Sequence, residues 1–152
     1  MVTLRRAVSA DEPALLRLAT RLGDFPVPPW RTASEIATAD HPILLASLRS
    51  PATDNALFVA DDLGALLGFV FVVVRTDYFT HERYGYVEDL ALAVKGEGRG
   101  LARRLMEAAE GWARSLGFRR IGLSVWFQNL RARGLYERLG YQPETMQYLK
   151  AL

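Results

Sequence analysis

A glycine-rich segment at residues 95–102, Lys-Gly-Glu-Gly-Arg-Gly-Leu-Ala, has the composition of a turn that binds phosphate. It leads into a predicted helix that begins at Arg99 and has no Ser, Thr, Asp or Asn to cap its first backbone N–H groups. Glycines let an anion approach the backbone, and a helix N-terminus attracts negative charge, so a phosphate would satisfy these donors. The alternative is a plain tight turn whose donors bind water.

The composition argues against several other kinds of site. No Lys followed by Ser or Thr comes after the last glycine of the turn, and no regular βαβαβ series follows it, so neither a Walker-type loop nor a dinucleotide fingerprint is expected. The sequence has no cysteine, which excludes thiolate nucleophiles and Cys-ligated zinc. Only His41 and His81 remain as histidine ligands, so we expect no metal.

The 152 residues are 50% hydrophobic and 24% charged, which predicts one folded domain over residues 1–152. The longest apolar stretch, residues 65–74, is too short to span a bilayer, and no secretory-type apolar run follows the N-terminus. We therefore expect a cytoplasmic protein without a membrane partner. The net charge is only +2 and the basic residues are not interleaved with aromatics, which argues against nucleic acid as a partner.

Hydrophobic periodicity and the Gly and Pro positions predict an α/β fold with a mixed sheet and helices on its faces. Gly117 and Gly140, each followed by an aromatic residue, predict Schellman motifs at the ends of the last two helices. Residues 61–64 predict a hairpin turn. The expected strands are Val2–Arg6, Ala56–Ala60, Ala65–Arg75, Tyr84–Val94, Arg119–Val125 and Thr145–Leu149; the expected helices are Asp11–Leu22, one from Ser34 to before Pro51, Arg99–Leu116 and Asn129–Leu139.

Two motifs in register resemble the GCN5-related N-acetyltransferases (GNAT). Strand 86–94 and the turn after it are similar to the family's acyl-CoA-binding motif, Arg or Gln, x, x, Gly, x, Gly or Ala. Gly100 and Ala102 match the last two positions, whereas Glu97 stands where Arg or Gln is usual and Val94 where Pro is frequent. Residues 129–141 are similar to the later motif, Asn, two residues, Ala, three residues, Tyr, ending in Leu-Gly-Tyr.

The resemblance covers nearly the whole chain and implies the fold, the cosubstrate and a set of site residues. It implies six to seven mostly antiparallel strands, four helices, an acyl-CoA cleft after the fourth strand, and acetyl-CoA without a metal. The Tyr136 hydroxyl would protonate the departing CoA sulfur, and Asn129 would contact the pantetheine or lie beside it. The implied cofactor-binding residues are Leu92, Ala93, Val94, Glu97, Gly98, Arg99, Gly100, Leu101, Ala102, Arg103, Asn129, Ala132 and Tyr136.

Each motif residue also has a structural interpretation. Asn129, Ala132 and Tyr136 share one face of their helix, so they are able to line one cleft. From the residues alone, Asn129 is equally suited to cap this helix, and Tyr136 to fill the core as a half-buried aromatic.

An acceptor amine must lose a proton before it attacks, because its pKa lies at about 10.4, so a catalytic base is expected. Glu88 and Asp89 are the candidates, and as neighbours on a strand they are expected to point to opposite faces. The Glu-Asp-Leu run resembles the diamine and polyamine branch of the family, in which the Glu is the proposed base. This favours Glu88, with Asp89 as the alternative; either carboxylate is also able to satisfy an Arg structurally.

Aromatic residues in three segments, the proline loop, the insertion 76–84 and the stretch after the penultimate strand, are candidates for binding the acceptor. They are Trp30, Tyr78, Phe79, Tyr84 and Trp126, for which packing on a sheet edge is the alternative. The expected function is transfer of an acetyl group from acetyl-CoA directly to a primary amine of a small molecule. Two alternatives stay open: a catalytically degenerate acyl-CoA-binding or regulatory module, and a protein or peptide N-acetyltransferase. The family implies a possible homodimer.

Overall fold

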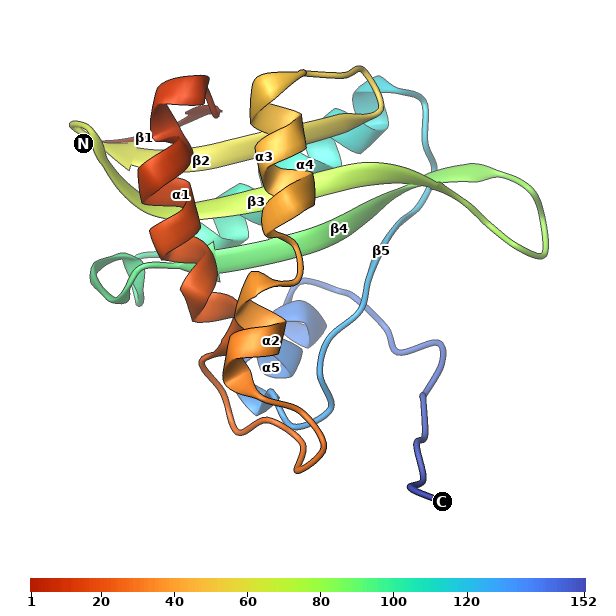
Figure 1. The fold of residues 1–152 in the computed structure, drawn as a ribbon. Helices are drawn as coiled ribbons and strands as arrows, with labels where there is room; N and C mark the ends of the chain where they lie inside the picture. Colours follow the sequence, from red (N-terminus) through yellow and green to blue (C-terminus); the bar gives the residue numbers. More distant parts are fainter.

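The computed structural model describes all of residues 1–152 as five strands and five α-helices, joined by short 3-10 turns (Figure 1). The strands are β1 (Val2–Arg6), β2 (Asn55–Asp62), β3 (Ala65–Thr76), β4 (Arg83–Leu92) and β5 (Ile121–Leu123). The helices are α1 (Glu12–Ala19), α2 (Ala33–Thr38), α3 (His41–Arg49), α4 (Leu101–Ser115) and α5 (Leu130–Arg138), and the 3-10 turns are η1 (Ser9–Asp11), η2 (Thr20–Gly23) and η3 (Val94–Gly96).

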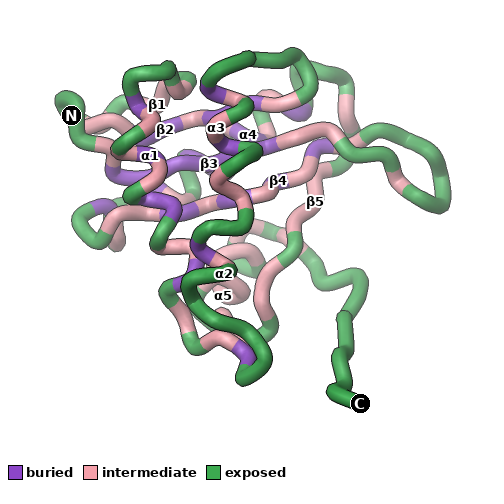
Figure 2. The backbone as a smooth tube through the Cα atoms, in the orientation of Figure 1, coloured by how far each residue is buried: buried purple, intermediate pink, exposed green.

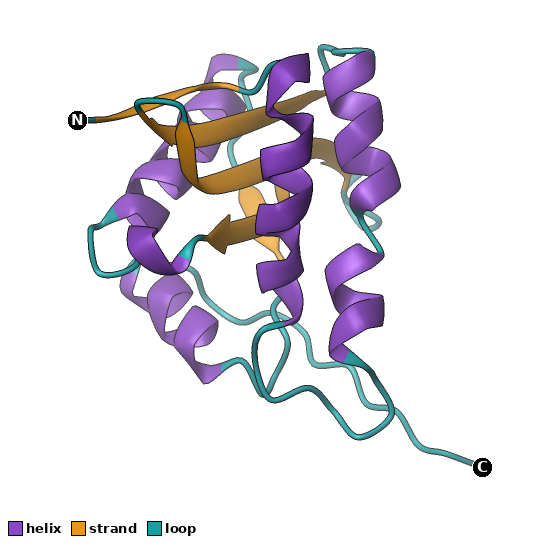
Figure 3. Cartoon of the chain, turned by 60° about the vertical axis from the view of Figure 1, so that its left-hand side comes forward, coloured by secondary structure: helices purple, strands orange, loops and turns teal.

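The strands form one sheet in the order β1-β2-β3-β4-β5. The first four strands are antiparallel neighbours, and β5 pairs with β4 in parallel. Helices α1 and α3 cover one face of the sheet and α4 covers the other, so the chain has three layers (Figures 1 and 3). The predicted mixed sheet with helices on both faces is confirmed.

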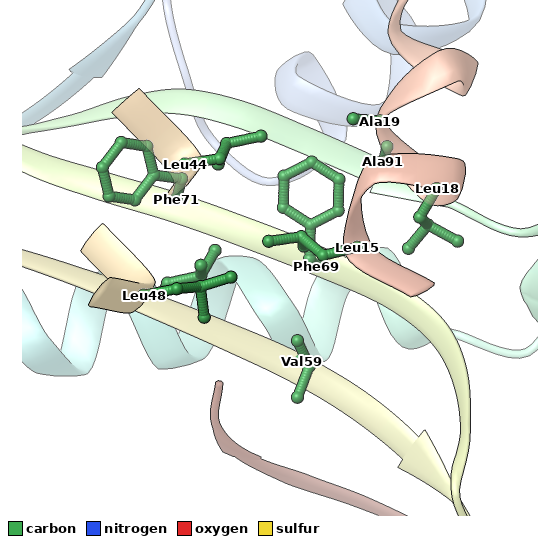
Figure 4. Packing of buried hydrophobic residues seen from close by; sticks show 10 residues of the cluster. Leu15, Leu18, Ala19, Leu44, Leu48, Val59, Phe69, Phe71 and Ala91 are labelled. Atoms are coloured by element: carbon green, nitrogen blue, oxygen red, sulfur yellow. The ribbon is translucent and has the colours of Figure 1, made fainter. Parts of the chain in front are cut away.

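Each face of the sheet packs its own hydrophobic cluster against its helices. On the side of α1 and α3, Leu15, Leu44 and Phe69 are fully buried (Figure 4). On the side of α4, Leu105 and Met106 are buried against the same strands. The buried positions therefore run along the middle strands, while the β3–β4 hairpin and the C-terminal segment are exposed (Figure 2).

Two predicted elements are wrong. The single helix expected from Ser34 to Pro51 is divided into α2 and α3, because Pro42 in the first turn of α3 has no N–H for the preceding turn and its ring would clash with that turn's carbonyl. The strand expected at Thr145–Leu149 is absent, so the sheet has five strands rather than six or seven. Residues 142–152 make no backbone hydrogen bond, and a strand forms only where a neighbouring edge accepts one.

Local turn predictions are confirmed. Gly117 and Gly140 have φ of 80° and 93°, and the aromatic residue after each donates its N–H to the carbonyl five residues back, as a Schellman motif requires. Leu63 and Gly64 both have positive φ, which is the backbone of a tight hairpin turn between β2 and β3. None of the helices combines the length and the apolar character that a membrane crossing requires.

Candidate active site

The candidate site begins where β4 separates from β5. The two strands pair only from Gly85 to Val87. On the other side of β4, Val72 of β3 lies opposite Val87 whereas Phe71 lies opposite Asp89, so Glu88 is one extra residue in the strand. Such a β-bulge bends its strand and increases its twist. Beyond the bulge, the outer edge of β4 therefore carries no partner strand.

This open edge presents backbone groups. The N–H of Ala93 donates to the carbonyl of Leu67 on β3, at 2.9 Å. Because alternate residues of a strand direct their N–H and C=O to opposite edges, the polar groups of Leu90 and Leu92 face the open side. The carbonyl of Leu92 accepts a hydrogen bond there from Nε of Arg21, at 3.1 Å. Of the predicted residues 92–94, Leu92 therefore offers its backbone, Ala93 is bonded to the sheet and Val94 is exposed.

The glycine-rich turn lies directly after this edge. Gly100 is the N-cap of α4 with φ of 71°, and no side chain caps the helix, as predicted. The N–H groups of six consecutive residues find no acceptor within the protein: Gly98, Arg99, Gly100, Leu101, Ala102 and Arg103. Oriented donors at the positive end of a 15-residue helix fit a phosphate, so the turn has the geometry that a pyrophosphate requires.

The side chains of this turn point elsewhere. Leu101 is buried in the core against the sheet. Nη2 of Arg99 lies 3.9 Å from the carboxylate of Asp62, and Nη1 of Arg103 lies 3.9 Å from that of Glu107. The backbone rather than the arginine side chains therefore forms the candidate phosphate cradle.

Glu97, which departs from the family pattern, forms an ionic bridge. Its carboxylate pairs with Arg21 of η2 and with Arg131 of α5, whose Nη1 lies 3.0 Å from Oε1. Arg21 also pairs with Asp24. The guanidinium of Arg131, with that of Arg21, holds the pKa of Glu97 below its usual range. The bridge therefore connects η2 and α5 to the turn.

Helix α5 supplies the second motif. The side-chain oxygen of Asn129 accepts the N–H of Ala132 at 3.2 Å, so Asn129 caps the helix, as its structural interpretation stated. The ring of Tyr136 packs against the α4-side core, edge-on to Tyr141 at 6.0 Å. Burial, with the nearby charge of Asp89, raises the pKa of Tyr136 to about 12. Its hydroxyl makes no hydrogen bond within the protein, so it is available to a ligand.

The expectation that Glu88 and Asp89 point to opposite faces is wrong, because the bulge interrupts the alternation. Both lie on the side of α3. Oε1 of Glu88 pairs with Nη2 of Arg75 at 2.7 Å, and Glu88 lines a groove beside α3. Asp89 is 7% exposed and its Oδ2 has no partner. Burial and the adjacent carboxyl of Asp40 raise the pKa of Asp89 to about 8.

The structure brings only some of the predicted aromatics to this region. The ring of Trp126 lies 6.1 Å from that of Phe25 and 5.8 Å from the guanidinium of Arg31, so it packs against the proline-rich loop that carries Trp30, which is 57% exposed. Tyr84 packs edge-on to Tyr86, before the bulge. Tyr78 and Phe79 are 85% and 86% exposed at the tip of the projecting β3–β4 hairpin and lie apart from the open edge (Figure 1).

Sequence reasoning missed Asp40 and Arg21. Asp40 lies in the break between α2 and α3, which the expected continuous helix concealed. Arg21 follows α1 in η2 and reaches Glu97, 76 residues away. Neither residue belongs to a motif. Pro42 is the one sequence signal for the break between α2 and α3 in which Asp40 lies.

Comparison with known proteins identifies the family of this chain. A model of the Acetyltransferase (GNAT) family matches residues 16–141. The chain belongs to this family. It is therefore an acyltransferase, in accordance with the two motifs found in the sequence. GNAT membership also supports acetyl-CoA as the cosubstrate.

Several relatives are similar over most of the chain. An uncharacterized N-acetyltransferase of Bacillus subtilis (strain 168), YhfO, is 26% identical over 95% of this chain and 92% of its own. An aminoglycoside N(6')-acetyltransferase type 1 of Stenotrophomonas maltophilia is 26% identical over 92% of this chain and 86% of its own. The structure of AAC(6')-Iy with a bisubstrate analogue has a TM-score of 0.72 at 20% identity, covering 100% of this chain and 99% of that one.

Proposed function

We propose that this GNAT protein transfers an acetyl group from acetyl-CoA directly to a primary amine of a small molecule. The observation that carries the proposal is the run of six unbonded N–H groups at the start of α4, next to the open edge of β4. The names of the aminoglycoside-acetylating relatives support a small-molecule amine as acceptor.

The backbone would hold most of the cosubstrate. The N–H groups of residues 98–103 suit the pyrophosphate, and the outward-facing N–H and C=O of Leu90, with the N–H of Leu92, suit the amides of the pantetheine arm. Bound acetyl-CoA supplies an activated acetyl group with a thiolate as the leaving group. Asn129 and Ala132, at the start of α5, lie on the same helix face as Tyr136 and line this region with it.

One side chain would act as a general acid and another as a general base. The hydroxyl of Tyr136 would donate to the departing sulfur, since it has no partner within the protein. A carboxylate would accept the proton of the amine. Glu88 is already paired with Arg75, whereas Asp89 keeps an unpartnered oxygen and a raised pKa, so the geometry favours Asp89 as the base over Glu88.

The acceptor side is acidic and aromatic. Glu88 lines the groove along α3, and Ile43 and Phe71 add apolar contacts there. Trp126 packs against the proline-rich loop that carries Trp30 and would add aromatic contacts to the acceptor.

A calorimetric titration with acetyl-CoA, followed by a thiol-release assay over a panel of primary amines, tests the proposal. We expect binding of acetyl-CoA and turnover that depends on at least one amine of the panel. The panel contains mono-, di- and aminoglycoside amines together with a peptide bearing a free N-terminus and a lysine. Binding without turnover on any amine would instead support the regulatory module, and turnover of the peptide alone would support a protein acetyltransferase.

A further inference from the structure

Asp40 lies at the N-cap position of α3 but does not cap the helix. An aspartate there normally accepts a hydrogen bond from the first turn, yet the side chain of Asp40 makes no such bond. Its carboxyl group instead lies beside that of Asp89 on β4. No Lys or Arg pairs with either residue. The two carboxyl groups are therefore in contact without a cation to neutralise them.

The surroundings leave Asp89 with one free oxygen. Asp89 is 7% exposed, and its Oδ2 has no hydrogen-bond partner. The ionisable groups around it are Asp40 from the α2–α3 break, Tyr136 from α5 and Glu88 from its own strand. His41, the neighbour of Asp40, also has a buried nitrogen, Nε2, without a partner. A buried, unpartnered carboxylate oxygen is unfavourable unless a ligand completes its hydrogen bonds.

We propose that Asp40 and Asp89 act as one proton acceptor, in which the pair takes a proton from the acceptor amine and holds it between the two carboxyl groups, with Asp40 as the positioning residue. This proposal rests on the proposed function above. As the C–N bond forms and the C–S bond breaks, one amine proton moves to Asp89 while Tyr136 donates one to the sulfur. Solvent then returns both side chains to their starting states.

Two carboxylates in contact bind their shared proton more tightly than either would alone, because the second negative charge opposes ionisation. Burial acts in the same direction for Asp89. A stronger base lies closer to the pKa of an amine, so the pair accepts the amine proton more readily once it is ionised, above about pH 8. The negative charge of Asp40 is thus the part of the pair that a substitution is able to remove without touching Asp89.

The test is the pH profile of kcat/KM for the wild type and Asp40→Asn. In the wild type we expect an acidic limb near pH 8, the pKa of Asp89. Asp40→Asn removes the opposing charge and provides an amide donor to Asp89, so the limb should move down by about one pH unit or more. Above the limb the rate should fall, since the remaining base is weaker. A merely structural role would lower the rate equally at every pH and leave the limb in place.

Three controls identify the titrating group. Two acceptor amines of different pKa separate the enzyme's limb from that of the substrate. Glu12→Gln removes a carboxylate of α1, which pairs with Arg49, and should leave the limb unmoved. Glu88→Gln tests the competing base: a limb abolished in Glu88→Gln and unmoved in Asp40→Asn would overturn the proposal.

Thermal unfolding without acetyl-CoA provides a readout that does not depend on turnover. If Asp40 opposes the ionisation of Asp89, the loss of thermal midpoint with rising pH, which begins near pH 3.8 in both proteins, should end about one pH unit lower in Asp40→Asn. An identical pH dependence in both proteins would overturn the carboxyl pair. This measurement tests the carboxyl pair even if no amine is turned over. If an amine is turned over but the acidic limb of kcat/KM does not move in Asp40→Asn, the carboxyl pair is contradicted and the proposed function is not.

Discussion

Burial changes the proton affinity of two side chains at the candidate site, in the same direction but with different consequences. It raises the pKa of Asp89 to about 8, which makes this carboxylate a stronger base, and the pKa of Tyr136 to about 12, which makes this phenol a weaker acid. Proton donation by Tyr136 therefore depends on a thiolate forming within hydrogen-bond reach, where transfer occurs along an existing contact.

Substitution of Tyr136 by Phe separates catalysis from packing. The ring keeps its edge-on contact with Tyr141, and the hydroxyl has no partner within the protein to lose. We expect the thermal midpoint and the affinity for acetyl-CoA to change little while kcat falls by about 10²–10⁴-fold, roughly 3 to 5 kcal/mol of barrier. The measurement is kcat beside the thermal midpoint with the best amine of the panel. A rate within about threefold of the wild type would remove Tyr136 from the catalytic residues.

Substitution of Asp89 by Asn tests its burial through the pH dependence of stability. The carboxyl is ionised above pH 3.8 in the unfolded chain but only above about 8 in the folded protein, so between these values the folded state binds an extra proton. Stability should therefore fall as pH rises from 4 to 8, by up to about 1.4 kcal/mol per pH unit. Asp89→Asn should flatten this slope and be the more stable protein at pH 8, as measured by denaturant unfolding. A slope equal to that of the wild type would contradict the raised pKa.

At the scale of elements, glycine substitutions at the two ends of α4 test acetyl-CoA binding separately from folding. Gly100 and Gly117 lie at opposite ends of this helix with φ of 71° and 80°, and a Cβ at either position would meet nothing within 4 Å. Gly100→Ala and Gly117→Ala should therefore lose similar stability, on the order of 1 kcal/mol each, from the left-handed backbone alone. Only Gly100→Ala places a methyl group on the candidate phosphate cradle.

The expected result is a roughly tenfold or larger loss of acetyl-CoA affinity in Gly100→Ala, measured by calorimetry, because a methyl group would hinder the approach of the phosphate to the backbone N–H groups. Gly117→Ala should bind acetyl-CoA as the wild type does. Equal affinity in the two variants would show that the start of α4 is not the phosphate site.

The elements that the sequence predicted well are those with local signals. The Schellman ends at Gly117 and Gly140 and the uncapped start of α4 depend on residues within one turn, and all are confirmed. The bulge at Glu88 depends on how β4 pairs with β3, and the contact of Asp40 with Asp89 spans 49 positions of the chain. Such non-local pairings leave no periodic pattern in the sequence. Neither the shared face of Glu88 and Asp89 nor the contact of Asp89 with Asp40 was therefore predictable from it.

The whole molecule is a sheet between two helical layers, with the candidate site at the end where the fifth strand stops. The last residues do not contribute to these layers: residues 142–152 make no backbone hydrogen bond, and Met146, Tyr148 and Leu149 are exposed (Figures 1 and 2). Tyr141, by contrast, bonds to Glu110 of α4 at 2.9 Å and anchors the end of α5 to the body.

Removal of residues 143–152 should therefore leave the fold intact. We expect the thermal midpoint of the truncated protein to lie within about 2 °C of the full chain, because the removed residues are all exposed and make no hydrogen bond to the rest of the chain. Sedimentation of both proteins at several concentrations serves as the companion measurement. A drop of many degrees, together with loss of a dimer, would mean that the tail packs against a second copy, as the family-level expectation of a homodimer allows.

The bulge at Glu88 also determines what the deletion of a single residue from β4 would do to the protein. Because Val87 and Asp89 already lie opposite neighbouring residues of β3, loss of the single codon for Glu88 would leave every core side chain of β4 on its present face. The strand would lose its bend and continue beside β5, closing the edge that Leu90 and Leu92 now present. One in-frame deletion is therefore expected to leave a folded protein that has no open edge for acetyl-CoA.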